Sequence, residues 1–143
     1  MTIPIAADHA GFELKEHLKG YLATLGHQTL DLGTHGTESM DYPDVAHPLA
    51  RLIDSGQHAL GIIICGSGNG VNITVNKYPN VRSALCWDEP LARLARQHND
   101  ANVMALPARF MTVAQAEACC ATFLSTDFEG GRHATRVDKI RCA

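Results

Sequence analysis

Short apolar runs alternate along the chain with segments in which apolar residues recur every three or four positions. The runs are rich in aliphatic side chains and predict strands over 3–7, 29–32, 60–65, 83–86 and 103–106. The run from Gly61 to Cys65 holds no polar residue, which is typical of a parallel strand covered on both faces.

Helical periodicity fills the intervals between these runs. Apolar stripes cover 14–25, 45–53 and 113–124, and Pro90 suits the first turn of a further helix. Gly26 and Gly56 follow the first two stripes as C-terminal caps, while Thr112 and Gln115 form a capping box before the third. The alternation predicts a three-layer, doubly wound α/β class. Because no linker, repeat or low-complexity stretch divides the chain, we predict one domain over residues 1–143.

Ligands of such sheets bind beyond the carboxyl ends of the strands, so the residues after each run are the candidates for function. Asp8-His9-Ala10-Gly11 follows the first strand. Asp8 would serve there as a helix N-cap, which is the simpler interpretation. Alternatively, Asp8 and His9 would bind sugar hydroxyls or move protons.

The third strand runs into a glycine-rich segment, Cys65-Gly66-Ser67-Gly68-Asn69-Gly70, followed by a possible short helix over 71–77. Glycines let successive N–H groups converge on an anion, so the loop predicts a phosphate or oxyanion site. The dinucleotide fingerprint is not matched, because Val71 stands where its third glycine would be, and a Walker A loop is absent. Asp88 and Glu89, about twenty residues on, leave a ribose-binding interpretation open.

Cys65 is the candidate base or nucleophile. A thiol at the lip of an anion-binding loop is expected to have a lowered pKa, which would make it reactive near neutral pH. The alternative is that Cys65 is a small hydrophobic residue that ends a buried strand.

The remaining candidates each have a simpler structural role. His98 would lie in the last turn of a helix, where an imidazole complements the dipole, with Asn99 as a left-handed cap. Arg109 follows the last strand and would be solvated. If 132–140 is helical, Arg132 and Arg136 share a face and can clamp a phosphate or form a solvated basic surface, with Val137 and Ile140 packing inward.

Charge and composition exclude several classes of function. The net charge of −3 gives no general attraction to nucleic acid or to an anionic membrane. No apolar run is long enough to span a membrane and no signal peptide is recognisable, so we expect a cytoplasmic protein. The five cysteines include no C-x-x-C pair, and no His, Cys and carboxylate residues have metal-ligand spacing, so we predict neither disulfides nor a metal.

Six segments together resemble the type B ribose-5-phosphate isomerases, and the resemblance runs the whole chain. They are Asp8-His9-Ala10-Gly11, Asp41-Tyr42-Pro43, Cys65-Gly66-Ser67-Gly68-Asn69-Gly70, Asn76-Lys77, Arg96-Gln97-His98-Asn99-Asp100 and Gly130-Gly131-Arg132-His133-x-x-Arg136. The resemblance implies a Rossmann-like sandwich with a five-stranded parallel sheet. It further implies a homodimer with active sites shared between subunits, and leaves open whether dimers pair into tetramers.

The resemblance also implies roles for individual residues. The family interconverts an aldose phosphate and its ketose through ring opening and a cis-enediolate, without a cofactor. Cys65 would then take the proton from C2, and the loop amides from Gly66 to Gly70, including those of Gly68 and Asn69, would hold the enediolate with the Ser67 hydroxyl. His98 would open the sugar ring. The remaining residues would bind substrate, the arginines chiefly through its phosphate: Asp8, His9, Asn99, Arg109, Arg132 and Arg136.

Three departures from the family pattern refine this prediction. Val71 occupies the position at which some members carry a glutamate base, so the chain belongs with the members that use a cysteine. Ser67 replaces a frequent threonine and keeps the hydroxyl. The chain ends at Ala143, earlier than many relatives, which leaves some dimer contacts open.

Two alternatives to ribose 5-phosphate isomerisation remain. Related enzymes act on allose or galactose 6-phosphate or on a free aldose, although three arginines favour a phosphate. The alternative that is not an enzyme is a phosphate- or nucleotide-binding module, in which Cys65 is a buried structural residue. The resemblance assigns His98 and Arg109 to the neighbouring subunit's site.

Overall fold

The computed structural model describes residues 1–142, and its strands pair into one parallel sheet. The strands are β1 (Thr2–Ala7), β2 (Gln28–Asp31), β3 (Gly61–Cys65), β4 (Ser83–Leu85) and β5 (Val103–Pro107). They lie in the order β2-β1-β3-β5-β4, and every neighbouring pair is parallel. The five-stranded parallel sheet predicted from the sequence is therefore confirmed, with strand ends that differ by one residue or so.

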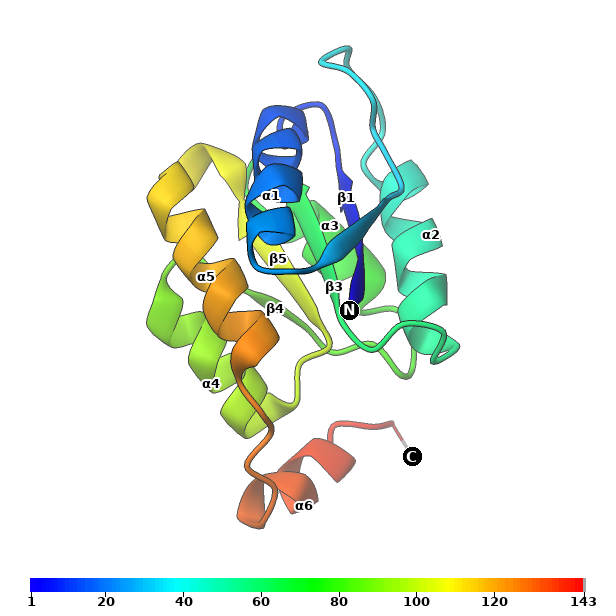
Figure 1. Cartoon of the computed structure of the whole chain (residues 1–143). Coiled ribbons are helices and arrows are strands. Elements are labelled where there is room, and N and C mark those ends of the chain that lie inside the picture. The colour runs from blue at the N-terminus through cyan, green and yellow to red at the C-terminus, as the bar shows by residue number, and fades with distance from the viewer. Residues whose placement is uncertain (143) are drawn as a thin grey trace.

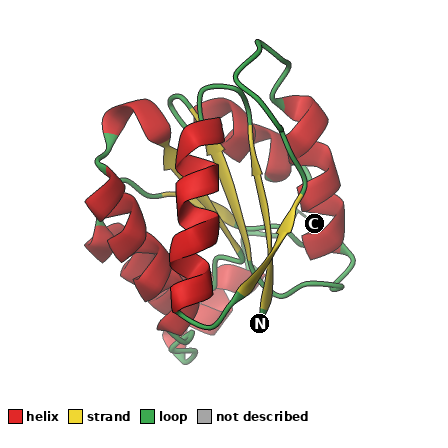
Figure 2. Ribbon diagram, turned by 45° about the horizontal axis from the view of Figure 1, so that its top comes forward, coloured by secondary structure: helices red, strands yellow, loops and turns green. Residues whose placement is uncertain are grey.

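Helices cover both faces of this sheet, which makes a three-layer α/β sandwich (Figures 1 and 2). The helices are α1 (Phe12–Thr24), α2 (Pro43–Asp54), α3 (Asn69–Val75), α4 (Glu89–Asn99), α5 (Val113–Ser125) and α6 (Arg132–Asp138), with a 3-10 turn over Ala108–Phe110. Helices α1, α4 and α5 pack on one face, and α2 and α3 pack on the other. Helix α6 lies beyond the edge at which the strands begin (Figure 1).

Alternate residues of the central strands pack into two separate hydrophobic cores, one on each face of the sheet. Ile62 and Ile64 face the α1 and α5 side, where Phe123 is fully buried. Ile63 and Cys65 face the α2 and α3 side. Since successive strand residues point to opposite faces, the apolar run in β3 packs against the helices on both sides of the sheet. This packing fixes Cys65 at the carboxyl end of the central strand.

The helix ends agree with most of the sequence signals. Thr112 and Gln115 exchange both hydrogen bonds of a capping box, and Gly26 and Gly56 have positive φ just beyond their helices. The cap predicted at Asn99 is wrong, because α4 includes Asn99 and the left-handed residue is Asp100, with φ of 46°. Aspartate tolerates that conformation better than most side chains.

Helix α6 is shorter than predicted and ends at Asp138. Gly130 and Gly131, both with positive φ, turn the chain into it. The inward packing expected for Ile140 is wrong, since that residue is 59% exposed. A two-turn helix beyond the end of the sheet covers too little of the core to bury both Val137 and Ile140.

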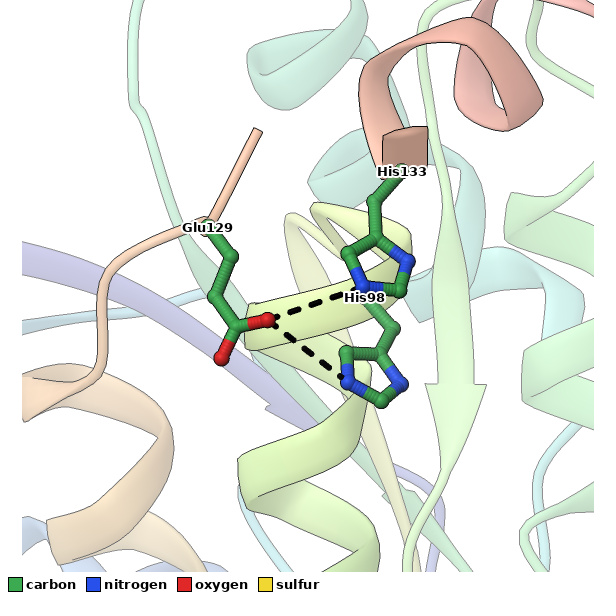
Figure 3. A group of neighbouring side chains, drawn as sticks. All are labelled: His98, Glu129 and His133. Carbon is green, nitrogen blue, oxygen red and sulfur yellow. Dashed lines mark ion pairs between the residues drawn. The ribbon is translucent and has the colours of Figure 1, made fainter. Parts of the chain in front are cut away.

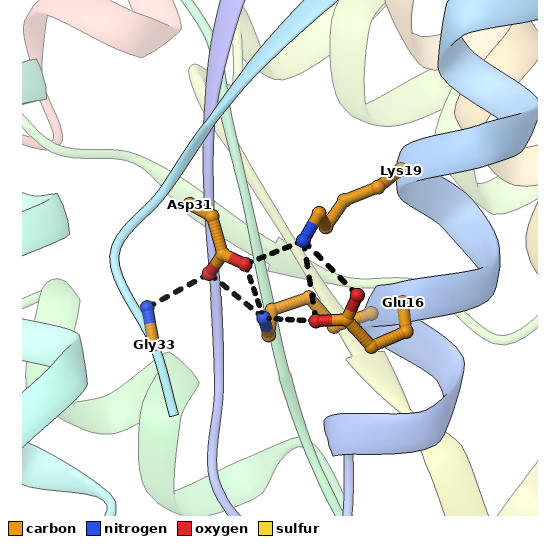
Figure 4. Close-up of polar contacts among 5 residues, drawn as sticks. Glu16, Lys19, Asp31 and Gly33 are labelled. Atoms are coloured by element: carbon orange, nitrogen blue, oxygen red, sulfur yellow. Dashed lines mark hydrogen bonds and ion pairs between the residues drawn. The ribbon is translucent and has the colours of Figure 1, made fainter. Parts of the chain in front are cut away.

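An ionic cluster joins α1 to the end of β2. Lys15 is fully buried, and its Nζ donates to both carboxylate oxygens of Asp31 at 2.7 Å. Asp31 also accepts hydrogen bonds from Lys19 and from the N–H of Gly33 (Figure 4). Burial alone would raise the pKa of Asp31, but these donors lower it to about 2. The cluster fixes the start of the 33–42 loop, which leads to the candidate site.

Candidate active site

A cavity of about 490 Å³ opens at the carboxyl ends of β1, β3 and β5. Its lining combines strand-end residues predicted from the sequence with neighbours that were not predicted. They are Asp8, His9, Ala10, Tyr42, Cys65, Gly66, Ser67, Gly70, Arg109 and Phe110. Cys65 is 5% exposed, so its thiol meets solvent only through this cavity.

The loop after Cys65 presents backbone donors to the cavity. Within residues 1–142, no protein acceptor takes up the N–H groups of Gly66, Ser67, Gly68 or Gly70. Gly68 adopts a left-handed conformation with φ of 75°, and a Cβ there would collide with Leu85. Only glycine fits this position. Because the N–H groups of the loop have no protein acceptor, the loop can hold an oxyanion close to the Cys65 thiol.

Ser67 is exposed on the same loop. Its Oγ accepts a hydrogen bond from the N–H of Asn69 at 3.2 Å. A hydroxyl that accepts from the protein keeps its own proton free to donate, so Ser67 adds a donor to the amides of the loop.

Tyr42 closes the cavity on the side of α2. Its ring packs against Gly70, where a Cβ would come within 2.6 Å of Cζ. Tyr42 lies eleven residues beyond the end of β2, too far along the chain for the strand-end rule to indicate it. Phe110, which is 73% exposed, was missed because an apolar residue in a turn carries no polar signal.

Asp8 and His9 approach the cavity from the end of β1. The N-cap predicted at Asp8 is wrong, because the N-cap of α1 is Gly11. Asp8 Oδ1 instead accepts a hydrogen bond from the Gly11 N–H at 3.1 Å. His9 Nδ1 accepts a hydrogen bond from the N–H of Met40 at 3.2 Å. In neutral His9 the proton therefore sits on Nε2, where it can be donated.

Arg109 lies beside the glycine loop of its own chain. Its N–H donates to the carbonyl oxygen of Gly66 at 3.0 Å, and its Nη1 would be 3.2 Å from a Cβ at Gly66. The family resemblance assigns Arg109 to the neighbouring subunit's site, whereas here Arg109 and Cys65 line one cavity of one chain. The guanidinium gives this cavity a cation for an anionic ligand.

The other predicted residues lie at the opposite end of the sheet. His98 and Asn99 end α4, and the N–H of Gly61, the first residue of β3, donates to the carbonyl of Asn102 just after that helix. Cys65 ends the same strand, about 13 Å away along β3. Arg132 and Arg136 lie on α6, beyond the same edge as His98 (Figure 1). A single chain therefore does not bring these four residues to the Cys65 cavity.

A second cavity, of about 660 Å³, lies at that opposite end. Asn99 is the one predicted site residue in its lining, together with Lys77, Arg82, Val137 and Arg141 among others. Although this cavity is larger, it lacks Cys65 and the free loop amides, and the cysteine in its lining, Cys142, is exposed, so its size does not identify it as the reaction site.

His98, Glu129 and His133 form a cluster near this end that the sequence analysis did not find (Figure 3). Glu129 Oε1 lies 3.8 Å from His98 Nε2 and 3.6 Å from His133 Nε2. Two histidines and a carboxylate are donors that a transition metal accepts. The imidazoles, however, stack with an interplanar angle of 11°, so their in-plane lone pairs run nearly parallel instead of converging. The absence of a metal stays a prediction.

The acids proposed for ribose binding are engaged elsewhere. Asp88 is the N-cap of α4 and accepts from the N–H of Glu89. Glu89 pairs with Arg93 and accepts from the Thr122 hydroxyl. Neither acid lines the Cys65 cavity, which removes the sequence support for a nucleotide site there.

No helix among residues 1–142 is long and apolar enough to cross a membrane.

Comparison with known proteins identifies the chain's relatives. Residues 3–140 match the family described as Ribose/Galactose Isomerase. The chain is 38% identical to ribose-5-phosphate isomerase B of Escherichia coli over 96% of this chain and 93% of that protein.

Solved structures superpose closely on the whole chain. The ribose 5-phosphate isomerase of Thermotoga maritima is 47% identical, with a TM-score of 0.95 over 98% of this chain and 97% of that one. The ribose-5-phosphate isomerase B of Mycoplasma genitalium, solved with bound ribulose-5-phosphate, is 42% identical, with a TM-score of 0.93 over 97% and 93%. With its strand-end cavity and these relatives, the chain is an isomerase and belongs to the ribose/galactose isomerase family.

Proposed function

We propose that this chain, as one domain over residues 1–143, interconverts ribose 5-phosphate and ribulose 5-phosphate without a cofactor. The observation that carries the proposal is the position of Cys65 beside unpaired loop amides, Asp8, His9 and Arg109 around one cavity. The bound ribulose-5-phosphate of the Mycoplasma genitalium relative supports this choice of substrate.

Cys65, as the thiolate, removes the proton from C2 of the open-chain aldose. The electrons of the C2–H bond form a C1–C2 double bond, and the carbonyl electrons move onto O1. The N–H groups of the glycine loop and the Ser67 hydroxyl hold the resulting oxyanion. Such preformed donors act only as charge develops, and removing one typically costs about 3 kcal/mol of transition-state stabilisation.

The second half of the reaction returns the proton to C1. The proton of the C2 hydroxyl passes to O1, the C2 carbonyl forms, and the double-bond electrons take the proton from Cys65 at C1. Atoms and charge balance without an external oxidant, since C1 is reduced as C2 is oxidised.

Ring opening is assigned to His98, which does not line the Cys65 cavity of its own chain. We infer that the chain forms a homodimer in which His98, Asn99, Arg132 and Arg136 of one subunit complete the cavity of the other. His98 then transfers the protons of ring opening, and the arginines join Arg109 in neutralising the phosphate. The opposite placement of these residues in a single chain supports this arrangement.

The test is conversion of ribose 5-phosphate to ribulose 5-phosphate in chelator-treated buffer. Native protein should turn over, and folded Cys65→Ala should lose roughly a hundredfold to ten-thousandfold in kcat. Allose 6-phosphate, galactose 6-phosphate and unphosphorylated ribose are run in parallel. An inert native protein, or a fully active Cys65→Ala variant, contradicts the proposal.

A further inference from the structure

Glu129 is held against the end of α4 by backbone contacts. Its N–H donates to the carbonyl of Gln97 at 3.1 Å, next to His98. Arg96 Nε donates to the carbonyl of Thr126 at 3.1 Å and fixes the same loop three residues earlier. The loop between α5 and α6 is thus attached to the last turn of α4 at two points, which fixes the backbone of Glu129 beside His98.

The side chains there form an ordered stack, as Figure 3 shows. The His98 and His133 rings lie parallel with centroids 4.1 Å apart, and Glu129 faces the Nε2 atom of both. His133 is buried, with 9% of its side chain exposed, while 39% of the His98 side chain is exposed. His98 is therefore the ring that can meet a substrate, and His133 backs it.

Electrostatics disfavours a positive charge on His133. The pKa of His133 is lowered by desolvation first, and then by the positive charges of His98, Arg132 and Arg136, with Glu129 acting in the opposite direction. Two stacked imidazoliums would repel each other. His98 is the more exposed of the two rings, and its Nε2 faces the Glu129 carboxylate.

We propose that Glu129, with His133 stacked behind His98, is the positioning residue that orients the His98 ring and retains its proton for opening of the sugar. This inference rests on the proposed function, in which His98 acts in ring opening. Glu129 itself does not touch the substrate. A carboxylate that faces Nε2 favours the protonated imidazole and the ring orientation that points Nε2 toward it.

Two reactions separate this role from a structural one. Isomerisation of ribose 5-phosphate, which exists as a furanose, requires ring opening. Ribulose 5-phosphate has its C5 oxygen esterified and is acyclic, so exchange of its C1 proton with solvent deuterium needs the enediolate chemistry but no ring opening. Glu129→Gln, which removes the charge and keeps the shape, is compared in both reactions with Asp127→Asn, an exposed carboxylate on the same loop.

Glu129→Gln should lower kcat on ribose 5-phosphate roughly tenfold to a hundredfold, and His98→Ala should lower it further. Exchange of the C1 proton of ribulose 5-phosphate with solvent deuterium should stay within about twofold of native in Glu129→Gln. The limb of the pH–rate profile on ribose 5-phosphate that reports His98 should move to lower pH in this variant. Asp127→Asn should match the native protein throughout. Equal losses in isomerisation and in C1-proton exchange, or none in either, would overturn the role of Glu129.

A measurement that needs no turnover keeps the inference testable if the substrate assignment fails. The His98 ring protons are followed by NMR as pH is varied, in the native protein and in Glu129→Gln. The His98 titration midpoint should fall on loss of the carboxylate. An unchanged midpoint refutes the proton-holding role, whereas an inert native enzyme with a shifted midpoint refutes only the substrate.

Discussion

The N–H of Met40 donates to Nδ1 of His9, and this contact decides which nitrogen of His9 can serve the cavity. Because the acceptor position is Nδ1, neutral His9 donates from Nε2. A Gln side chain places its amide nitrogen near Nε2, and an Asn places it near Nδ1. We therefore expect His9→Gln to raise KM only about threefold and His9→Asn to raise it about tenfold, corresponding to one hydrogen bond of about 1 kcal/mol or more.

Steady-state kinetics of the two variants checks this prediction, and nitrogen-15 NMR of the native histidine checks the tautomer directly. A protonated Nδ1 in neutral His9, or a better-performing His9→Asn, would show that the Met40 contact does not set the donor.

The close approach of Tyr42 to Gly70 makes the loop sensitive to a single methyl group. Gly70→Ala would place a Cβ within 2.6 Å of the Tyr42 ring, which must then leave the cavity wall. Since the loop amides and this wall are preorganised together, we expect a loss of tenfold or more in kcat/KM, or about 1.4 kcal/mol. Gly20→Ala is the matched control.

Gly20 lies inside α1 with open space around its Cα, so an alanine there meets nothing within 4 Å. That substitution should leave activity unchanged and stabilise the protein by about 0.5–1 kcal/mol through helix propensity. Kinetics with thermal unfolding measures both effects. Unchanged activity in Gly70→Ala would mean that the wall is not part of the site.

Three buried thiols provide an internal reference for Cys65. Burial raises the pKa of Cys86 to about 12, with Cys119 adding to the shift, and raises that of Cys119 to about 11, with Asp88 and Glu89 adding. Burial also raises the pKa of Cys120. These thiols stay protonated and unreactive near neutral pH.

In a Cys142→Ser background, which removes the exposed cysteine, iodoacetamide at pH 7 should modify Cys65 at least tenfold faster than the buried thiols. Inorganic phosphate should slow the modification, because it occupies the anion site beside the loop. Peptide mass spectrometry reads out each site. If Cys65 is labelled as slowly as Cys120, Cys65 is a buried structural residue and not the catalytic base.

Acid stability should depend on the Asp31 cluster. The pKa of Asp31 is lowered from 3.8 to about 2 by its donors against the effect of burial, so the folded state favours the carboxylate. Its contribution is complete above pH 3.8 and is lost as pH falls through about 2. Asp31→Asn leaves the buried Lys15 ammonium poorly compensated and should cost about 3 kcal/mol at neutral pH.

Urea unfolding of the native protein and Asp31→Asn between pH 2 and pH 7 tests this, with Asp44→Asn on the surface as the control. The stability difference between native and Asp31→Asn should shrink in the acid range. A difference that does not depend on pH would contradict the assignment of the ionic cluster.

The fold could be predicted because each of its elements has a local signal. The uninterrupted apolar run in β3 and the capping box at Thr112 are decided by neighbours a few residues away. The ends of elements were less certain because competing caps differ little in energy: Asp100, not Asn99, takes the left-handed position after α4.

The residues that line the candidate site were found by sequence wherever they follow the strand-end rule. Cys65 ends β3, and Asp8 and Arg109 follow the ends of β1 and β5 within two residues, so the parallel strands bring all three to one end of the sheet. Tyr42 reaches the cavity through a long loop, and Glu129 reaches His98 through contacts between α4 and the segment before α6. Such contacts depend on tertiary packing, which residue spacing does not reveal.

The central claim is that each active site takes Cys65 from one chain and His98 from another. Folded Cys65→Ala and His98→Ala proteins, each inactive, are mixed in equal amounts under conditions that allow subunit exchange, and exchange is verified by co-purification of differently tagged chains. Half of the dimers are then mixed and carry one intact site each, so the account predicts recovery of about one quarter of native activity on ribose 5-phosphate. A parallel mixture of Cys65→Ala with Asp8→Ala, which damages the same half of the site, should recover none. Verified exchange without recovered activity in the first mixture would contradict the account.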